Sequence, residues 1–154
     1  MNPFKRHKKP APPTPEERAE AALGQLRRLL AFDDLEGSLE LIERTRRDLP
    51  SFELPEEELM SLIKRLDAEK RVSESIPFMD DYIRRFPEKA SRIRLRLARY
   101  LVDGKRPARA LLILDGIVEG SLPEKLMKIR DQIQLEAEET MEEGEIELDG
   151  PMCG

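Results

Sequence analysis

The sequence predicts an all-α protein, arranged as a right-handed α-solenoid of about three antiparallel helix pairs with a C-terminal capping helix. The first observation is an internal repeat: a segment that begins at Arg71 aligns with one that begins at Arg106, an offset of 35 residues. An upstream copy places Ser38 on Ser75, an offset of 37 residues, and a period of about 35 residues is typical of helical repeat arrays. The second observation is the composition, with 39% hydrophobic, 38% charged and only 5% aromatic residues. Such a chain fits a thin two-layer array with a core of Leu, Ile, Ala and Met.

The first helix pair is predicted over residues 15–30 and 35–48. Thr14 can cap the first helix, Pro15 suits its first position, and Glu17 completes a capping box. Pro50 ends the second helix. The apolar side chains expected to face inward in this pair are Ala22, Leu23, Leu26, Leu29, Leu30, Leu35, Leu39, Ile42 and Leu49.

The second pair is predicted to begin at Pro55 and to continue in a helix over 72–86, which Pro87 stops. A clear helical stripe in its first helix has apolar residues at positions i, i+3, i+4 and i+7, namely Leu59, Leu62, Ile63 and Leu66. Pro77 lies inside the predicted second helix and removes one backbone donor there. A slight bend or a late start of this helix is therefore expected.

The third pair is predicted over 89–102 and 107–119, joined by a turn at Asp103 and Gly104. Its first helix should bury Ile93, Leu97, Ala98 and Leu101. A capping box that begins at Ser121 should open a seventh helix, whose inward stripe is Leu122, Leu126, Ile129 and Ile133. After Leu135 the apolar pattern fades, as expected of a terminal helix with a polar outer face.

The two ends of the chain differ from its body in charge. Residues 1–13 contain four basic residues, no acid and four prolines, a composition typical of a disordered tail. Residues 136–154 contain eight acidic residues and no base. The predicted organisation is a disordered basic tail over 1–13, a helical repeat domain over 14–140 and a disordered acidic tail over 141–154.

The repeated residues resemble the tetratricopeptide repeat, whose unit is about 34 residues folded as two antiparallel helices. The resemblance covers residues 16–135. Ser38, Ser75 and Ala110 match the small residue at which the two helices of that family approach closely. The usual aromatic residue of the first helix is absent, and Ile63 replaces a small residue there. The resemblance implies a protein–protein interaction scaffold in which the first helix of each pair lines a concave face.

The sequence contains no pattern typical of an enzyme or a metal centre. His7 is the only histidine and Cys153 the only cysteine, so neither a His/Cys metal cluster nor an internal disulfide is expected. No phosphate loop or nucleophile motif is present. We therefore expect no catalysis, no cofactor and a reducing, cytoplasmic compartment. No apolar run reaches the roughly 18 residues of a membrane span, although the basic N-terminal tail could contact an anionic surface weakly.

One basic side chain per repeat matches the concave face that the resemblance implies. Arg27, Lys64 and Arg99 are separated by 37 and 35 residues, the offsets of the repeat itself. Arg92 and Arg96 neighbour Arg99 at helical spacing. These five residues are predicted to bind an acidic peptide or an acidic helix of a protein partner. A solvated charged surface is the competing interpretation.

Two alternatives and one further hypothesis remain at this point. Residues 84–109 contain ten basic and two acidic residues, which allows a nucleic-acid-binding module. Only Phe86 and Tyr100 could stack on bases there, and the chain is acidic overall, which argues against it. A regulatory subunit of a larger enzyme is the second alternative. The hypothesis is that residues 136–149 fold back on the basic region and compete with an acidic partner. The competing interpretation is a tail that only aids solubility.

Overall fold

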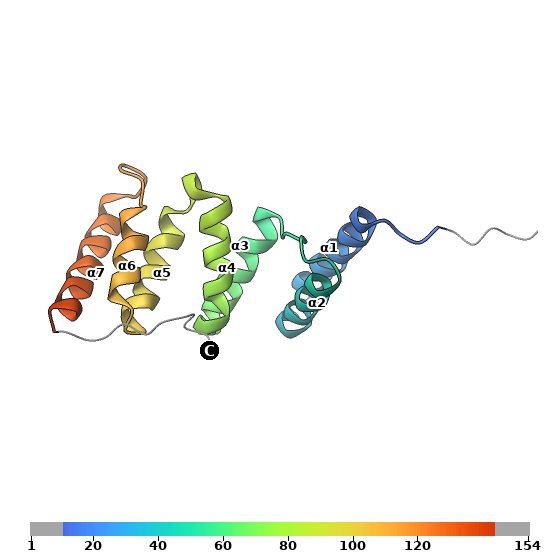
Figure 1. Cartoon of the computed structure of the whole chain (residues 1–154), viewed down its shortest axis with the longest axis horizontal. Coiled ribbons are helices and arrows are strands. Elements are labelled where there is room, and N and C mark those ends of the chain that lie inside the picture. The colour runs from blue at the N-terminus through green and yellow to red at the C-terminus, as the bar shows by residue number, and fades with distance from the viewer. Residues whose placement is uncertain (1–10, 144–154) are drawn as a thin grey trace, which may run out of the picture. The chain divides into compact units, whose positions relative to one another are not determined.

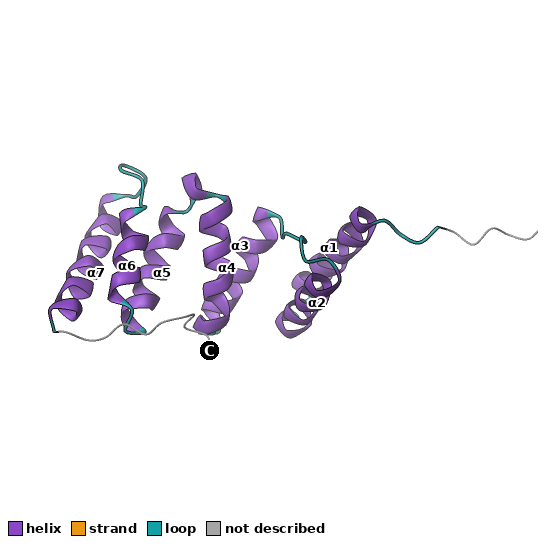
Figure 2. Cartoon of the chain, in the orientation of Figure 1, coloured by secondary structure: helices purple, strands orange, loops and turns teal. Residues whose placement is uncertain are grey.

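A computed structural model describes residues 11–143 and confirms an all-α protein (Figure 1). Every regular element in this range is a helix and none is a strand (Figure 2). The chain divides into two compact units, Met1–Pro55 and Glu56–Gly154. The first contains α1 (Pro15–Ala31) and α2 (Leu35–Asp48). The second contains α3 (Glu56–Ala68), α4 (Val72–Arg85), the short 3-10 helix η1 (Pro87–Lys89), α5 (Ser91–Asp103), α6 (Pro107–Asp115) and α7 (Glu124–Glu142).

The first unit is a pair of packed helices, and α1 begins with the N-terminal cap that the sequence predicts. The backbone N–H of Glu17 donates to the hydroxyl oxygen of Thr14 at 3.1 Å, and Pro15 occupies the first helical position. Arg18 of α1 forms an ion pair with Asp48 of α2 at 2.6 Å. The buried side chains of the two helices are Leu26, Leu30, Leu35, Leu41 and Ile42, together with Ser38 and Thr45. Leu41 was not expected to be buried, whereas Leu39 is only half-buried.

In the second unit each α-helix packs on the next one along the chain, and α5 also contacts α7 (Figure 1). The predicted stripe of α3 is confirmed, since its four apolar side chains, Leu59, Leu62, Ile63 and Leu66, are all fully buried. Leu97, Ala98 and Leu101 of α5 are fully buried as well. α5 packs on α4, α6 and α7, so contacts on α5 connect most helices of this unit.

The same turn joins the two helices of every pair. Asp33, Lys70 and Lys105 each adopt a left-handed backbone, with φ of 60°, 59° and 64°. They are separated by 37 and 35 residues, the offsets of the sequence repeat. The N–H of the residue that follows donates to the carbonyl five residues earlier, namely from Asp34 to Leu29, from Arg71 to Leu66 and from Arg106 to Leu101, at 2.9, 2.9 and 2.8 Å. This pattern is a helix-terminating motif that favours glycine in the left-handed position.

The small residues of the repeat frame occupy equivalent sites after this turn. Ser38, Ser75 and Ala110 are each 0% exposed. Their N–H groups donate to the carbonyls of Asp34, Arg71 and Arg106 at 3.0, 3.1 and 3.1 Å. The three helix pairs are therefore copies of one local structure, as the sequence alignment predicted.

Glycine at the left-handed positions is expected to stabilise the protein. A side chain with a β-carbon in this conformation costs about 1–2 kcal/mol, and glycine avoids that cost at the price of a more flexible unfolded chain. Lys70→Gly and Lys105→Gly should each raise the free energy of unfolding by about 0.5–1 kcal/mol, measured by urea denaturation. Lys64→Gly, in the middle of α3, is the matched control and should lower it by about 1 kcal/mol. Destabilisation by all three changes would contradict the role of the turn.

The sixth helix is shorter than predicted. It ends at Asp115 instead of residue 119, and Gly116 is its C-cap. The reason lies on α5: the guanidinium of Arg94 donates to the carbonyl of Ile113 at 3.1 Å. A β-carbon at position 116 would lie 2.1 Å from Nη1 of Arg94. In a continued α-helix the carbonyl of Ile113 would accept from the N–H of Ile117, but that N–H donates to the carbonyl of Leu114 at 3.0 Å. Arg94 bonds to the Ile113 carbonyl instead.

The start of the seventh helix was also predicted incorrectly. α7 begins at Glu124 with Pro123 as its cap, and no side chain caps it. The hydroxyl of Ser121 instead lies 2.6 Å from that of Ser91 and donates to the carbonyl of Val118. Within α7, Ile133 and Ala137 are buried, whereas Ile129 is exposed. The helix continues to Glu142, well beyond the point at which the apolar pattern fades.

Two smaller expectations concern proline and the start of the fifth helix. Pro77 lies inside α4, which begins at Val72, so the late start is wrong. Pro77 and Ser73 are both exposed, so that the carbonyl of Ser73, which loses its helical donor, can bond to water. The fifth helix begins at Ser91 instead of 89, because η1 precedes it.

Candidate partner-binding site

The five predicted binding residues belong to two different units. Arg27 lies on α1 in the first unit and is exposed. Lys64 lies on α3, and Arg92, Arg96 and Arg99 lie on α5, all in the second unit. The three arginines have the spacing i, i+4 and i+7, so they share one face of α5. The structure thus brings three of the five residues together on one helix.

Arg96 is engaged by an acid of the preceding helix pair. Its guanidinium donates to Oδ2 of Asp67 at 2.6 Å. The other oxygen of Asp67 accepts hydrogen bonds from the hydroxyls of Ser75, at 3.1 Å, and Tyr100, at 2.9 Å. The Asp67 side chain is only 11% exposed. Burial raises the pKa of Tyr100 to about 12, and the bond to Asp67 adds to this effect.

Arg99 is engaged by an acid of the following helix. It forms an ion pair with Glu136 of α7 and a longer one, of 3.6 Å, with Asp103. The guanidinium of Arg99 holds the pKa of the Glu136 carboxyl below its usual value. Asp67 and Glu136 therefore use two of the α5 arginines to join α5 to α3 and to α7.

Arg92 and Lys64 have no ion-pair partner among residues 11–143, and both are exposed. Lys64 lines a shallow hollow on α3 with Glu56, Glu57, Met60 and Ser61. Glu56 accepts hydrogen bonds from Lys89 at 3.1 Å and from Tyr82 at 3.0 Å, and these two contacts lower its pKa. Lys64 therefore lies beside the carboxylates of Glu56 and Glu57.

The ten basic residues of 84–109 give less free positive charge than their number suggests. The acids that pair with them lie mostly outside this segment: Asp81 pairs with Arg84 and Arg85, Glu56 with Lys89, and Asp80 with Arg109. Asp81 lies three and four residues before its partners, whereas Glu56 and Asp80 lie 33 and 29 residues before theirs. Sequence analysis missed these pairs because it counted charges only within the segment.

The two aromatic residues of this region are also engaged. The ring of Phe86 lies 5.1 Å from that of Tyr82, and the guanidinium of Arg85 lies 5.0 Å from the Phe86 ring centre. The Tyr100 hydroxyl is bound to Asp67. Neither ring is therefore arranged as a free platform for stacking on a base, which gives the nucleic-acid alternative no structural support.

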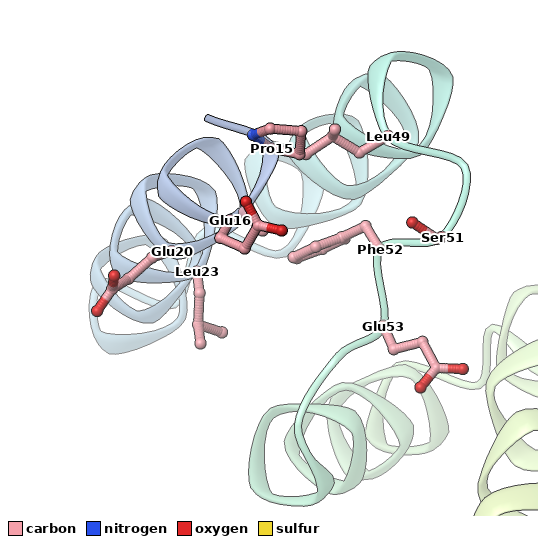
Figure 3. A pocket seen from close by; sticks show the side chains of 9 residues that line it. Pro15, Glu16, Glu20, Leu23, Leu49, Ser51, Phe52 and Glu53 are labelled. Atoms are coloured by element: carbon pink, nitrogen blue, oxygen red, sulfur yellow. The ribbon is translucent and has the colours of Figure 1, made fainter. Parts of the chain in front are cut away.

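A second candidate surface lies in the first unit, where nine residues line an open hollow of about 330 Å³ (Figure 3). Its apolar lining consists of Pro15, Ala19, Leu23, Leu49 and Phe52, and its polar lining of Glu16, Glu20, Ser51 and Glu53. The Phe52 side chain extends from the loop after α2 towards the side of α1 that bears Glu16 and Leu23 (Figure 3). Sequence analysis missed this hollow because α1 and that loop meet only in the fold. The one local sign was the like-charged pair of Glu16 and Glu20 at i and i+4.

The other sites considered from the sequence are a metal centre, a membrane span and the two tails of the chain. Within residues 11–143 no group of three or more His, Cys, Asp or Glu side chains could hold a metal ion. In the same range no helix is long and apolar enough to cross a bilayer. His7, Cys153, the basic residues of the 1–13 tail and the part of the acidic tail after residue 143 lie outside the described range.

Comparisons of the chain with models of protein families, with curated proteins and with solved structures find no significant match.

Proposed function

We propose that this protein is a non-catalytic adaptor or scaffold for protein–protein interaction, built as a tetratricopeptide-like, right-handed α-solenoid of three helix pairs and the capping helix α7. The observation that supports it is the recurrence of one turn at Asp33, Lys70 and Lys105, each followed by a fully buried small residue. Arrays of such helix pairs present extended surfaces to protein partners. The cytoplasm is the proposed compartment, because the single cysteine excludes an internal disulfide.

The proposed binding face for an acidic segment is the arginine row of α5. Arg92 is exposed and supplies the first contact, while Arg96 and Arg99 retain exposed fractions of 47% and 34% despite their ion pairs. An acidic segment would share these two arginines with Asp67 and Glu136. Binding is therefore expected to be weak and strongly dependent on salt, since the screening length is about 8 Å at physiological ionic strength.

Charge reversal at Arg92 tests this proposal without disturbing the core. Arg92→Glu should weaken binding of a fluorescein-labelled glutamate-rich peptide by about three- to tenfold, the equivalent of about 0.6–1.4 kcal/mol, measured by fluorescence anisotropy at low salt. Lys128→Glu on α7 is the matched control, because Lys128 is also an exposed cation of the second unit, and it should leave the affinity unchanged. Arg99→Glu is a poorer test, since it would break the pair with Glu136.

An unchanged affinity in Arg92→Glu would remove the α5 face from consideration. Affinity purification of the full chain followed by mass spectrometry distinguishes an adaptor from a subunit of a larger enzyme, because only the latter would copurify with an enzyme at fixed stoichiometry.

A further inference from the structure

The hollow of the first unit combines apolar walls with an acidic rim. Ala19 and Leu23 of α1 and Phe52 of the loop after α2 are half-buried, and Leu49 is buried. Carboxylates stand around them: Glu16 and Glu20 on α1, and Glu53 on the loop (Figure 3). Among residues 11–143 no basic side chain lines the hollow. A surface of this kind matches a ligand that has an apolar body and a positively charged end.

The two carboxylates of α1 repel each other. Glu16 and Glu20 have the spacing i and i+4, at which like charges destabilise a helix. Glu16 gains from its place in the first turn of α1, but Glu20 lies beyond that turn. Neither carboxylate has an ion pair within the range 11–143, and the neighbouring Arg18 is engaged with Asp48 at 2.6 Å. The helix therefore retains negative charge at the hollow that no described side chain compensates.

We propose that this hollow binds a lysine or arginine side chain in a basic segment of a partner protein. The aliphatic stem of such a side chain packs along Ala19, Leu23 and Leu49, as long basic side chains commonly do on apolar surfaces. Its charged end then lies between the carboxylates and the ring of Phe52, which attracts a cation through its π face. A volume of about 330 Å³ lies at the small end of ligand sites, which suits one long side chain.

The basic residues of this chain's own N-terminus fit this site less well than those of a partner. Pro10, Pro12 and Pro13 separate them from α1. Thr14 has φ −67° and ψ 161°, which is polyproline II geometry, and residues 11–14 lead away from the start of α1 (Figure 1). Proline-rich segments are stiff and extended, so a return to the hollow would need a reversal of the chain before Pro10.

The test uses the full chain and a fluorescein-labelled peptide of alternating leucine and arginine at physiological salt. The double variant Glu16→Gln and Glu20→Gln keeps the size of both side chains and should weaken binding about tenfold, the equivalent of about 1.4 kcal/mol. Phe52→Leu keeps an apolar side chain but removes the ring, and should weaken binding about threefold. Glu139→Gln with Glu143→Gln is the matched control, because Glu139 on the last turn of α7 and Glu143 at its C-cap are both exposed and have the same spacing. It should leave the affinity unchanged.

Several outcomes would overturn the proposal. An equal loss of affinity in the control pair would show only nonspecific attraction to an acidic protein. Equal binding of a peptide with glutamate in place of arginine would show that the carboxylates of the hollow play no part. Binding that is seen only after removal of residues 1–10 would make the chain's own tail the occupant. Arg92→Glu should not affect this peptide, so that failure at the hollow and failure at the α5 face are distinguishable. Circular dichroism of each variant confirms that the helices are intact.

Discussion

Replacement of Asp67 by alanine is expected to lower the free energy of unfolding by about 2–4 kcal/mol, because the variant loses hydrogen bonds to a charged group that is nearly buried. The carboxylate of Asp67, near the end of α3, binds Ser75 on α4 and both Arg96 and Tyr100 on α5. Its removal therefore breaks a contact shared by three helices. It also leaves the buried hydroxyl of Ser75 and the half-buried hydroxyl of Tyr100 without this acceptor. Urea denaturation measures the change.

Asp103→Ala is the matched control for this prediction. Asp103 is also an aspartate near the end of a helix, but its side chain is 65% exposed and its ion pair with Arg99 is 3.6 Å long. Exposed pairs of this kind contribute about 0–1 kcal/mol, so the control should change stability by less than Asp67→Ala. Similar losses in the two variants would contradict a special role for the Asp67 network.

The same network predicts how stability depends on alkaline pH. Burial and the bond to Asp67 raise the pKa of Tyr100 from its ordinary value of 10.0 to about 12 in the folded protein. The unfolded chain therefore releases the phenolic proton first, so stability is complete below about pH 10 and falls as the pH rises to about 12. Asp67→Ala should lower the pKa of Tyr100 while burial still holds it above 10. The absorbance of the phenolate measures this pKa, and Tyr82, bound to Glu56 and with a pKa also raised to about 12, should not change.

Ala110→Leu is expected to lower the free energy of unfolding by about 1–3 kcal/mol, because extra methylene groups force a packed core apart. Ala110 is 0% exposed and lies on α6, which packs on both α5 and α7. It is also the third-pair equivalent of Ser38 and Ser75. Ala68→Leu adds the same atoms at an exposed position at the end of α3, and should alter stability by about 0.5 kcal/mol at most. If urea unfolding of the Ala110 variant matches that of the control, α6 is not closely packed at this site.

The features that sequence analysis predicted correctly are those that recur. Ser38, Ser75 and Ala110 could be aligned because each follows the same turn, and that turn depends on local backbone hydrogen bonds. The stripe around Leu62 was clear for a similar reason, since α3 is apolar at regular helical spacing. A local sequence pattern is sufficient to predict a structural element when residues close together in the sequence determine that element.

The features that were missed depend on residues far apart in the chain. At the end of α6 the carbonyl of Ile113 is bound by Arg94, which lies on another helix. Arg99 was predicted to bind an acidic partner, and the sequence did not show that Glu136 of α7 also pairs with it within the protein. A count of charges along a segment cannot show which acids from other helices neutralise them. The hollow around Phe52 was missed because its two walls are separated by the whole of α2.

The division into two units affects how unfolding is observed. The chain has two tyrosines and no tryptophan, and both tyrosines, Tyr82 and Tyr100, belong to the second unit. Their ultraviolet signals therefore report on that unit alone, whereas circular dichroism sums the helices of both. The described part of the first unit, residues 11–55, has two helices, and so small a structure buries little of its surface. A comparison of the two spectroscopic signals therefore shows whether the two units unfold together. Coincident transitions by the two methods mean that the chain unfolds as one cooperative unit. An earlier loss of the helical signal means that α1 and α2 unfold separately from the second unit.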